Sequence, residues 1–257
     1  LAEFAQADLN FYLENPRLYT VVRADGKEPT QEEIEETLAT MDHVKILVQS
    51  IKENGGLTDA IIVQGGTNVV LEGNSRLAAY RILAKQDPIK WGKIKARVLP
   101  ETIAESEVFS LLGQYHIIGR KDWAPFEQAG YLYRRHKTHG VSIPDLARDI
   151  HLGKKAIAHL IHVYEFMVKH GEEGNVNRWS YYDEYLKSNK IKKARKDHPG
   201  FDDLVVEKIK SEEIPRAVDI RDGLRKIVEA GGRILERFVS EKKTFDELVE
   251  RIKKDPH

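Results

Sequence analysis

The stretch VVLEGNSRLAAYRIL, residues 69–83, decides the fold of the first part of this 257-residue chain. Its first three residues are apolar, which predicts a buried strand, and the following Glu72-Gly73-Asn74 breaks that strand. From Ser75 onward apolar residues recur at helical spacing, so a helix begins directly after the turn. Such a junction directs free backbone N–H groups and the positive end of the helix dipole at any group that lies near the helix start. The stretch therefore predicts an α/β unit with a candidate anion site.

Two side chains of this loop carry candidate chemistry. Arg76 lies in the predicted first turn of the helix, where a guanidinium can make paired hydrogen bonds to a phosphate or a carboxylate. Glu72 lies at the strand end, where its carboxylate can hold a hydroxyl or a metal ion. The alternative is an ordinary strand–turn–helix connection in which Asn74 or Ser75 caps the helix and Arg76 makes a surface ion pair. The loop is not a Walker A motif, which needs two glycines and a Lys-Ser/Thr pair.

The neighbouring segments extend this pattern into a whole fold. Helices are predicted over 28–38, 43–52 and 75–85, and strands over 60–64, 67–71 and 94–99. After residue 106 helices are predicted over 107–115, 123–136, 142–150 and 154–168, followed by a polar, turn-rich segment over 171–200 and two or three further helices over 201–254. We therefore expect an α+β fold: a small α/β domain over 1–105, an all-α helix–turn–helix domain over 106–170 and a helical C-terminal region over 171–257.

The segment VSIPDLARDIHLGKKAIAHLIHVYEFM, residues 141–167, predicts the helix–turn–helix motif. Ser142 and Asp145 have capping-box spacing, and a short turn containing glycine separates the two helices. In this motif the start and outer side of the second helix contact DNA. The candidate DNA-binding residues are Ser142, Lys154, Lys155 and His159. The alternative is a plain helical hairpin in a bundle.

Charge and composition narrow the class of partner. The chain has 41 Lys and Arg against 41 Asp and Glu, but residues 107–200 carry about five more basic than acidic side chains. Six Lys or Arg fall within residues 187–198, a run that is either a solvated surface or a phosphate contact, while the aromatic residues at 179–185 are expected to pack. The chain lacks cysteine, which excludes disulfides and thiolate chemistry. It shows no leader peptide and no apolar run of about 20 residues, so we expect a cytoplasmic protein without a membrane partner.

With these features in place, the chain resembles the ParB/sulfiredoxin superfamily. Its quoted stretch is similar to the family's G-x-x-R-x-x-A box, and Asn15-Pro16-Arg17 to an early N-P-R element. Residues 48–63 and residues 120–129 (RKDWAPFEQA) are similar to two further family motifs, in the family's order. The resemblance covers residues 15–165 and is weak beyond residue 171.

The resemblance implies a nucleotide-binding domain, with CTP as the ligand and its phosphates on the G-x-x-R loop. The residues it assigns to the nucleotide are Arg17, Glu72, Gly73, Asn74, Ser75, Arg76 and Arg120. It also implies a homodimer. The family's Mg²⁺-binding Glu-Asn pair reads His116 and Ile117 here, and isoleucine cannot coordinate a metal ion. We therefore expect no protein metal site and at most slow nucleotide hydrolysis.

The function expected from these observations is DNA binding regulated by a bound nucleotide, in DNA partition or transcription control, with a nucleoid-associated location. One alternative is a small-molecule kinase of the free-serine type from the same superfamily, using Glu72 as its catalytic residue. Those kinases usually carry D-G-x-H-R in the loop, and Asn74-Ser75 supplies no histidine before Arg76. A third possibility is a transcription regulator that needs no nucleotide.

Overall fold

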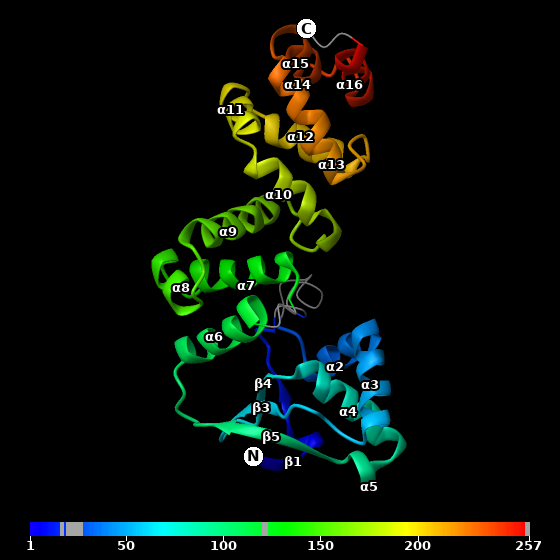
Figure 1. Cartoon of the computed structure of the whole chain (residues 1–257), viewed down its shortest axis with the longest axis vertical. Helices are drawn as coiled ribbons and strands as arrows, with labels where there is room; N and C mark the ends of the chain where they lie inside the picture. The colour runs from blue at the N-terminus through cyan, green and yellow to red at the C-terminus, as the bar shows by residue number, and fades with distance from the viewer. Residues whose placement is uncertain (16–17, 19–27, 120–122, 255–257) are drawn as a thin grey trace. The chain divides into compact units, whose positions relative to one another are not determined.

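The computed structural model describes residues 1–15, 18, 28–119 and 123–254, and the chain divides into two compact units, residues 1–154 and 155–257. The first unit contains a β-sheet with helices packed on it, and the described part of the second is built from helices (Figure 1). The predicted α+β class is therefore confirmed. The expected domain boundaries after residues 105 and 170 differ from this division and remain a prediction about which parts fold independently.

The described sheet of the first unit has five strands in the order β1-β5-β3-β4-β2. The strands are β1 (Ala2–Ala5), β2 (Asn10–Phe11), β3 (Ile61–Gln64), β4 (Val69–Glu72) and β5 (Lys93–Leu99). β3 pairs antiparallel with β4 and parallel with β5, β1 pairs antiparallel with β5, and β2 runs parallel to β4. β3 lies at the centre and its Ile and Val residues are buried, as a strand covered on both faces requires.

Three helices gather on one side of this sheet (Figure 1): α2 (Gln31–Thr40), α3 (Asp42–Asn54) and α4 (Asn74–Gln86). α2 begins at a capping box, in which Thr30 Oγ1 accepts from Glu33 N at 3.2 Å and the Glu33 carboxylate accepts from Thr30 N at 2.8 Å. α3 ends at Gly55, whose φ of 69° suits glycine. Buried apolar side chains of all three helices pack against the sheet and form one core. The short segments η1 (Gln6–Asp8) and α5 (Pro88–Trp91) complete this layer.

The rest of the first unit is helical: α6 (Glu105–Gly113), a π-helical segment η2 (Gln114–Gly119), α7 (Pro125–Lys137) and α8 (Ile143–Asp149). α6 contacts both β4 and α8. Arg134 of α7 is 3% exposed and its Nε donates to the Glu14 carboxylate at 3.3 Å, which ties α7 to the segment that follows β2. These contacts place η2 next to the end of β4.

The second unit begins with α9 (Lys154–Lys169) and continues through short helices. They are η3 (Val176–Arg178), α10 (Trp179–Lys187), α11 (Asn189–Asp197), α12 (Phe201–Lys210), α13 (Ala217–Asp219), η4 (Ile220–Leu224), α14 (Arg225–Ala230), α15 (Gly232–Val239) and α16 (Phe245–Lys254). None of the helices in the described ranges is long and apolar enough to span a membrane.

Two parts of the sequence prediction need correction, and one is confirmed. The edge strands β1 and β2 were not predicted, because neither is a run of β-branched residues. The segment 171–200, predicted as turn-rich, contains α10 and α11. Its aromatic side chains Trp179, Tyr182 and Tyr185 are at most 8% exposed, so the expectation that they pack is confirmed for these three.

Candidate functional site

The connection from β4 to α4 depends on Gly73. This residue has φ 101° and ψ 23°, in the left-handed region that side-chain-bearing residues rarely adopt. A Cβ at this position would lie 2.5 Å from Ile61 Cγ2, so the neighbouring strand leaves no space for a side chain. Only Gly73 therefore separates the end of β4 from the start of α4, and none of the described side chains caps the N-terminus of α4. The predicted strand–glycine–helix junction is confirmed.

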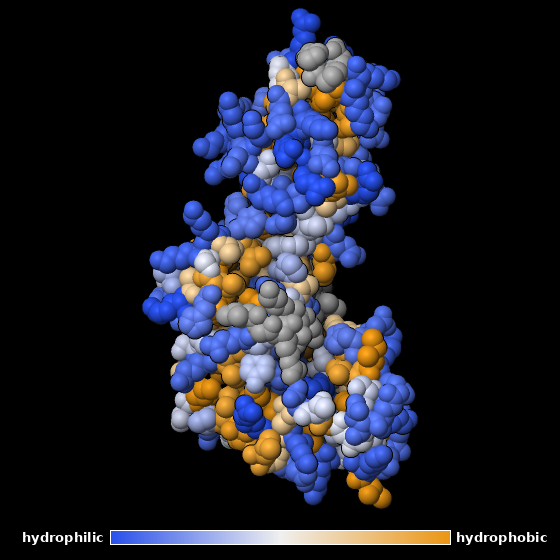
Figure 2. Space-filling view, in the orientation of Figure 1, coloured by the Kyte–Doolittle hydropathy of each residue, from blue (hydrophilic) through white to orange (hydrophobic). Residues whose placement is uncertain are grey.

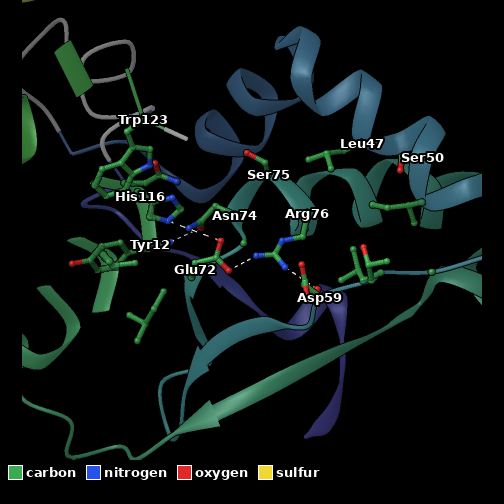
Figure 3. Close-up of a pocket in the computed structure, with 18 of the residues that line it drawn as sticks. Tyr12, Leu47, Ser50, Asp59, Glu72, Asn74, Ser75, Arg76, His116 and Trp123 are labelled. Carbon is green, nitrogen blue, oxygen red and sulfur yellow. Dashed lines mark hydrogen bonds and ion pairs between the residues drawn. The ribbon is translucent and has the colours of Figure 1, made fainter. Parts of the chain in front are cut away.

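Arg76 and Glu72 form an ion pair within this junction. The Arg76 guanidinium donates to the Glu72 carboxylate, and its Nη1 also donates to the carbonyl oxygens of Asp59 at 2.7 Å and Ala60 at 3.3 Å. The Arg76 and Glu72 side chains are only 13% and 9% exposed, so the pair is largely withdrawn from water. A surface ion pair for Arg76 was the alternative expected from the sequence; the pair exists, but it is buried in the wall of a cavity (Figure 3).

His116 reaches the same place from η2. The hydrogen bonds of a π-helix span one residue more than those of an α-helix, and such segments are frequent at functional sites. His116 Nε2 lies 4.0 Å from Glu72 Oε1, and the imidazole stacks on the Trp123 indole with ring centroids 4.3 Å apart and planes 12° apart. From the sequence, His116 was expected only as a lost metal ligand. The structure gives it a place beside the carboxylate at the centre of the site.

The cavity enclosed by these residues has a volume of about 220 Å³. The floor of the cavity is formed by the loop between β4 and α4, residues 72–76. One side is formed by Tyr12, His116 and Trp123. The opposite wall comes from α3 and the loop that follows it, and includes Ser50, Asn54, Thr58 and Asp59. Figure 3 shows the labelled side chains of both walls around the Arg76 guanidinium. The cavity thus combines a helix N-terminus, a cation and several hydroxyl and amide groups.

Asn74 and Ser75 have different surroundings, although the sequence assigned both to the ligand. Asn74 is 4% exposed; its Oδ1 accepts from Tyr12 N at 2.9 Å and its Nδ2 donates to the Val70 carbonyl at 3.0 Å. This amide therefore joins the chain after β2 to β4. Ser75 Oγ lies 3.0 Å from His43 Nε2, which belongs to α3. Asn74 thus orders the loop, while Ser75 faces the helices that border the cavity.

The phenol of Tyr12, which lines the same side of the cavity as His116, has a raised pKa. Burial, followed by the nearby Glu14 charge, raises the pKa of the Tyr12 phenol to about 12. The hydroxyl therefore stays protonated at neutral pH and remains a hydrogen-bond donor. Of the other residues assigned to the nucleotide, Arg17 and Arg120 lie outside the described residues.

The candidate DNA-binding residues lie on α8 and α9. Ser142 caps α8: its Oγ accepts from Asp145 N at 3.2 Å, while the hydroxyl donates to the Asp145 carboxylate at 2.5 Å. In a full capping box the Asp145 carboxylate would accept a hydrogen bond from the Ser142 backbone N–H. Here that carboxylate accepts from the Ser142 hydroxyl instead. Lys154 and Lys155 are exposed at the start of α9. His159 does not project freely, because its Nε2 lies 2.7 Å from Asp183 Oδ1 of α10.

Sequence reasoning missed part of the site. Three residues come from segments expected only as helix or loop: His43, which contacts Ser75, Asp59, whose carbonyl accepts from Arg76, and Trp123, which stacks on His116. These contacts depend on tertiary packing. The one usable signal was the pair His116-Ile117, which stands where the resemblance to the ParB/sulfiredoxin superfamily implies a Glu-Asn pair. Within the described ranges, no group of three or more His, Asp or Glu is placed to hold a metal ion.

Comparison with known proteins gives a limited result. No family model and no curated protein matches the sequence. Among solved structures, the C-terminally truncated chromosome-partitioning protein ParB from Caulobacter crescentus complexed to the centromeric parS site is similar, with a TM-score of 0.37 and 12% identity over 99% of this chain and 100% of that chain. The same protein complexed with CTP-gamma-S has a TM-score of 0.30 and 14% identity, covering 76% of this chain and 97% of that chain. These TM-scores are too low to transfer the role of any residue.

Proposed function

We propose that this chain is a ParB-like protein that binds a nucleotide, CTP, at the junction of β4 and α4 and binds duplex DNA through α8 and α9. The observation that carries the proposal is the buried Arg76–Glu72 pair at a helix N-terminus in the wall of a cavity. A helix N-terminus with an adjacent guanidinium is suited to a phosphate group. The polar side chains of α3 across the cavity suit a sugar or a base.

Phosphate binding at this site requires an exchange of partners. In the structure the Glu72 carboxylate neutralises Arg76. A phosphate bound at the N-terminus of α4 competes with Glu72 for the guanidinium, and the freed carboxylate can then accept a hydrogen bond from a ribose hydroxyl. Arg17, Gly73, Ser75, Arg76 and Arg120 are the proposed phosphate ligands. We propose no metal ligand, because Ile117 is an apolar, 4% exposed side chain where the family has a metal-binding residue.

The DNA-binding part of the proposal rests on α8 and α9. Ser142, Lys154 and Lys155 are the proposed contacts, and the two lysines are exposed at the start of a helix. His159 contributes by holding α9 to α10 through Asp183 rather than by touching bases. We propose that the protein acts as a homodimer, in partition or transcription control, and that nucleotide binding regulates its affinity for DNA.

Calorimetric titration of CTP, ATP and ADP, with and without duplex DNA, tests the proposal. The Arg76→Ala variant should bind CTP about tenfold to a hundredfold more weakly, because it loses a charge-assisted hydrogen bond worth roughly 1.5–3 kcal/mol. Arg97→Ala is the matched control, since Arg97 is exposed on β5 and does not line the cavity. Equal CTP affinity of a folded Arg76→Ala variant and the wild type would remove the nucleotide site. DNA binding without any nucleotide affinity would identify a nucleotide-independent regulator.

A second candidate function is a small-molecule kinase. The observation that favours it is His116 Nε2 at 4.0 Å from Glu72 Oε1, which places an acid–base pair in the cavity. Such a pair can accept the proton of an alcohol when that alcohol attacks a phosphate. Phosphate transfer from ATP or ADP to free serine is the diagnostic measurement. Formation of phosphoserine that Glu72→Gln abolishes would move the protein to this class.

A further inference from the structure

α11 presents a row of lysines that the proposed nucleotide and DNA sites do not use. The helix is anchored by Ile191, which is fully buried, and by Ala194, which is 3% exposed. Lys190, Lys192, Lys193 and Lys196 are all exposed, and we call them the lysine face of α11. Residues three and four apart on a helix are neighbours, so these ammonium groups stand close together. Figure 2 shows a hydrophilic surface over α11.

The lysine face carries an excess of positive charge. In the part of the chain that the structure describes, none of its four lysines forms an ion pair. The carboxylate nearest in sequence is Asp197, at the C-terminal end of α11, and its single negative charge is outweighed by the four lysines. The next carboxylates have other partners: Asp202 binds Arg195, with Nε–Oδ1 2.6 Å and Nη2–Oδ2 3.1 Å, and Glu184 binds Lys187 at 2.5 Å. Like charges at this spacing destabilise an isolated helix, by about 0.2–0.5 kcal/mol per pair. A polyanionic partner would convert this repulsion into attraction.

The lysine face lies on a helix that packs beside α9. The guanidinium carbon of Arg195, on α11, lies 5.5 Å from the ring centroid of Phe166, on α9. This contact brings α11 close to the C-terminal half of α9. Both helices belong to the second compact unit. A partner that lies along α9 would therefore meet α11 as well.

The residue types on and around the lysine face indicate which kind of polyanion it binds. A helix that binds a lipid surface presents large apolar residues beside its lysines, but the apolar residues of α11 are buried in the protein. Lysine is depleted in protein–protein interfaces, whereas the phosphates of duplex DNA, one charge per about 1.7 Å of helix axis, are neutralised by lysine and arginine. α11 is about 14 Å long at about 1.5 Å per residue, enough to follow several successive phosphates.

We infer that the lysine face of α11 binds the sugar–phosphate backbone of duplex DNA, next to the DNA-binding helix α9. This inference rests on the proposed DNA-binding function and deepens it by naming a second contact helix. Backbone contacts of this type position a protein on DNA without reading its sequence. The lysine face should therefore contribute to affinity for every duplex, specific or not.

Salt dependence measures the number of phosphates that α11 neutralises. Fluorescence anisotropy with a random-sequence duplex, over roughly 50–200 mM salt, gives the slope of log K against log salt. Replacing Lys190, Lys192, Lys193 and Lys196 by Gln should reduce that slope by up to about 3.6 and the affinity by roughly tenfold to a thousandfold, at about 0.9 per lost phosphate contact. Lys and Gln have similar helix propensity, so α11 should stay folded, and circular dichroism verifies it.

Two control variants isolate the position and the charge. Lys226, Lys242, Lys253 and Lys254 are exposed in the same unit, and replacing them by Gln removes the same charge elsewhere, so the slope should stay within about half a unit of the wild type. Arginine at all four α11 positions should retain binding. A third variant, Lys154→Gln with Lys155→Gln, reports on α9 separately.

The results of these experiments distinguish failure of the α11 inference from failure of the proposed function. Duplex binding by the wild type with an unchanged slope in the α11 variant would overturn the role of α11 and leave the function standing. Absence of duplex binding by the wild type even at about 50 mM salt would overturn both. Binding of wild-type protein to anionic lipid vesicles that the α11 variant loses, with duplex binding unaffected, would assign the lysine face to a membrane surface instead.

Discussion

The left-handed backbone conformation of Gly73 determines where the charged side chain of Arg76 lies. The left-handed turn at Gly73 lets β4 pass into α4 without an intervening loop, so Arg76 lies one helical turn from Glu72 at the strand end. The turn thus fixes the position of the cation and of its carboxylate together.

Replacing Gly73 by Ala should destabilise the first unit by at least about 1–3 kcal/mol. The reason is twofold: φ is 101°, and the new Cβ would lie 2.5 Å from Ile61 Cγ2. Denaturant unfolding followed by tryptophan fluorescence measures the loss. Gly153→Ala is the control in the same unit, since a Cβ there meets nothing within 4 Å. A Gly73→Ala protein as stable as that control would show that the turn tolerates a side chain.

At these positions the sequence predicted the residues but not all of their partners. The helix pattern after Gly73 predicted Arg76 in the first turn, because local spacing determines this. The contact of Arg76 with the Asp59 carbonyl and the approach of His116 to Glu72 join segments 17 and 44 residues apart in the chain (76 − 59 and 116 − 72). No local pattern encodes such pairs.

At the scale of single elements, prediction succeeded where apolar periodicity was strong. The helices α3, α4 and α9 and the strands β3 and β5 begin and end within a few residues of the expected bounds. α10 and α11 were missed because residues 171–200 are dominated by polar side chains and turn formers. Their helical form depends on a few buried contacts: Tyr182 and Tyr185 on α10, Ile191 on α11.

A buried carboxylate connects α9 with α10. Glu172 is 2% exposed, and its oxygens accept from Arg178 Nη1 at 3.0 and 2.9 Å, from Tyr182 Oη at 3.0 Å and from Asn175 Nδ2 at 3.2 Å. These bonds also raise the pKa of the Arg178 guanidinium, and burial, followed by the Glu172 charge, raises that of the Tyr182 phenol. Glu172 thus organises the start of α10, the helix that holds His159.

Glu172→Gln should destabilise this corner by about 1–3 kcal/mol, because an amide cannot accept all of these hydrogen bonds at both of its terminal atoms. Hydrogen–deuterium exchange over residues 176–187 should become faster. Glu173→Gln is the matched control, since Glu173 is the exposed neighbour in the chain. Exchange in Glu172→Gln as slow as in Glu173→Gln would show that the network does not hold α10.

At the scale of the whole molecule, sequence and structure agree on the fold class, while the predicted domain boundaries after residues 105 and 170 stay a prediction. An α/β part followed by helices was predicted from the change of period near residue 100, and this holds. The first compact unit extends to residue 154, and within it buried Arg134 of α7 pairs with Glu14, which follows β2. A sequence pattern shows where the elements change type, but not which of them share long-range ion pairs.

The last prediction concerns turnover: the whole protein should bind nucleotide and hydrolyse it slowly or not at all. Metal ions stabilise the charge that develops in phosphoryl transfer, and a protein holds Mg²⁺ through carboxylate and carbonyl oxygens. The two positions at which the resemblance to the ParB/sulfiredoxin superfamily implies a metal-binding pair hold His116, which stacks on Trp123, and Ile117, which is buried and apolar. Glu72 supplies one carboxylate, and Arg76 already occupies it.

Phosphate release should be measured with CTP, ATP and ADP in the presence of Mg²⁺, with and without duplex DNA and free serine. We expect binding by calorimetry together with release far below about one turnover per second, the lower end of typical enzyme rates. The variant His116→Glu with Ile117→Asn restores two oxygen ligands and should raise the rate if the missing metal seat is the cause. Wild-type release at several turnovers per second would contradict the prediction. Fast release that depends on serine would instead identify the kinase, with Glu72 and His116 as its acid–base pair.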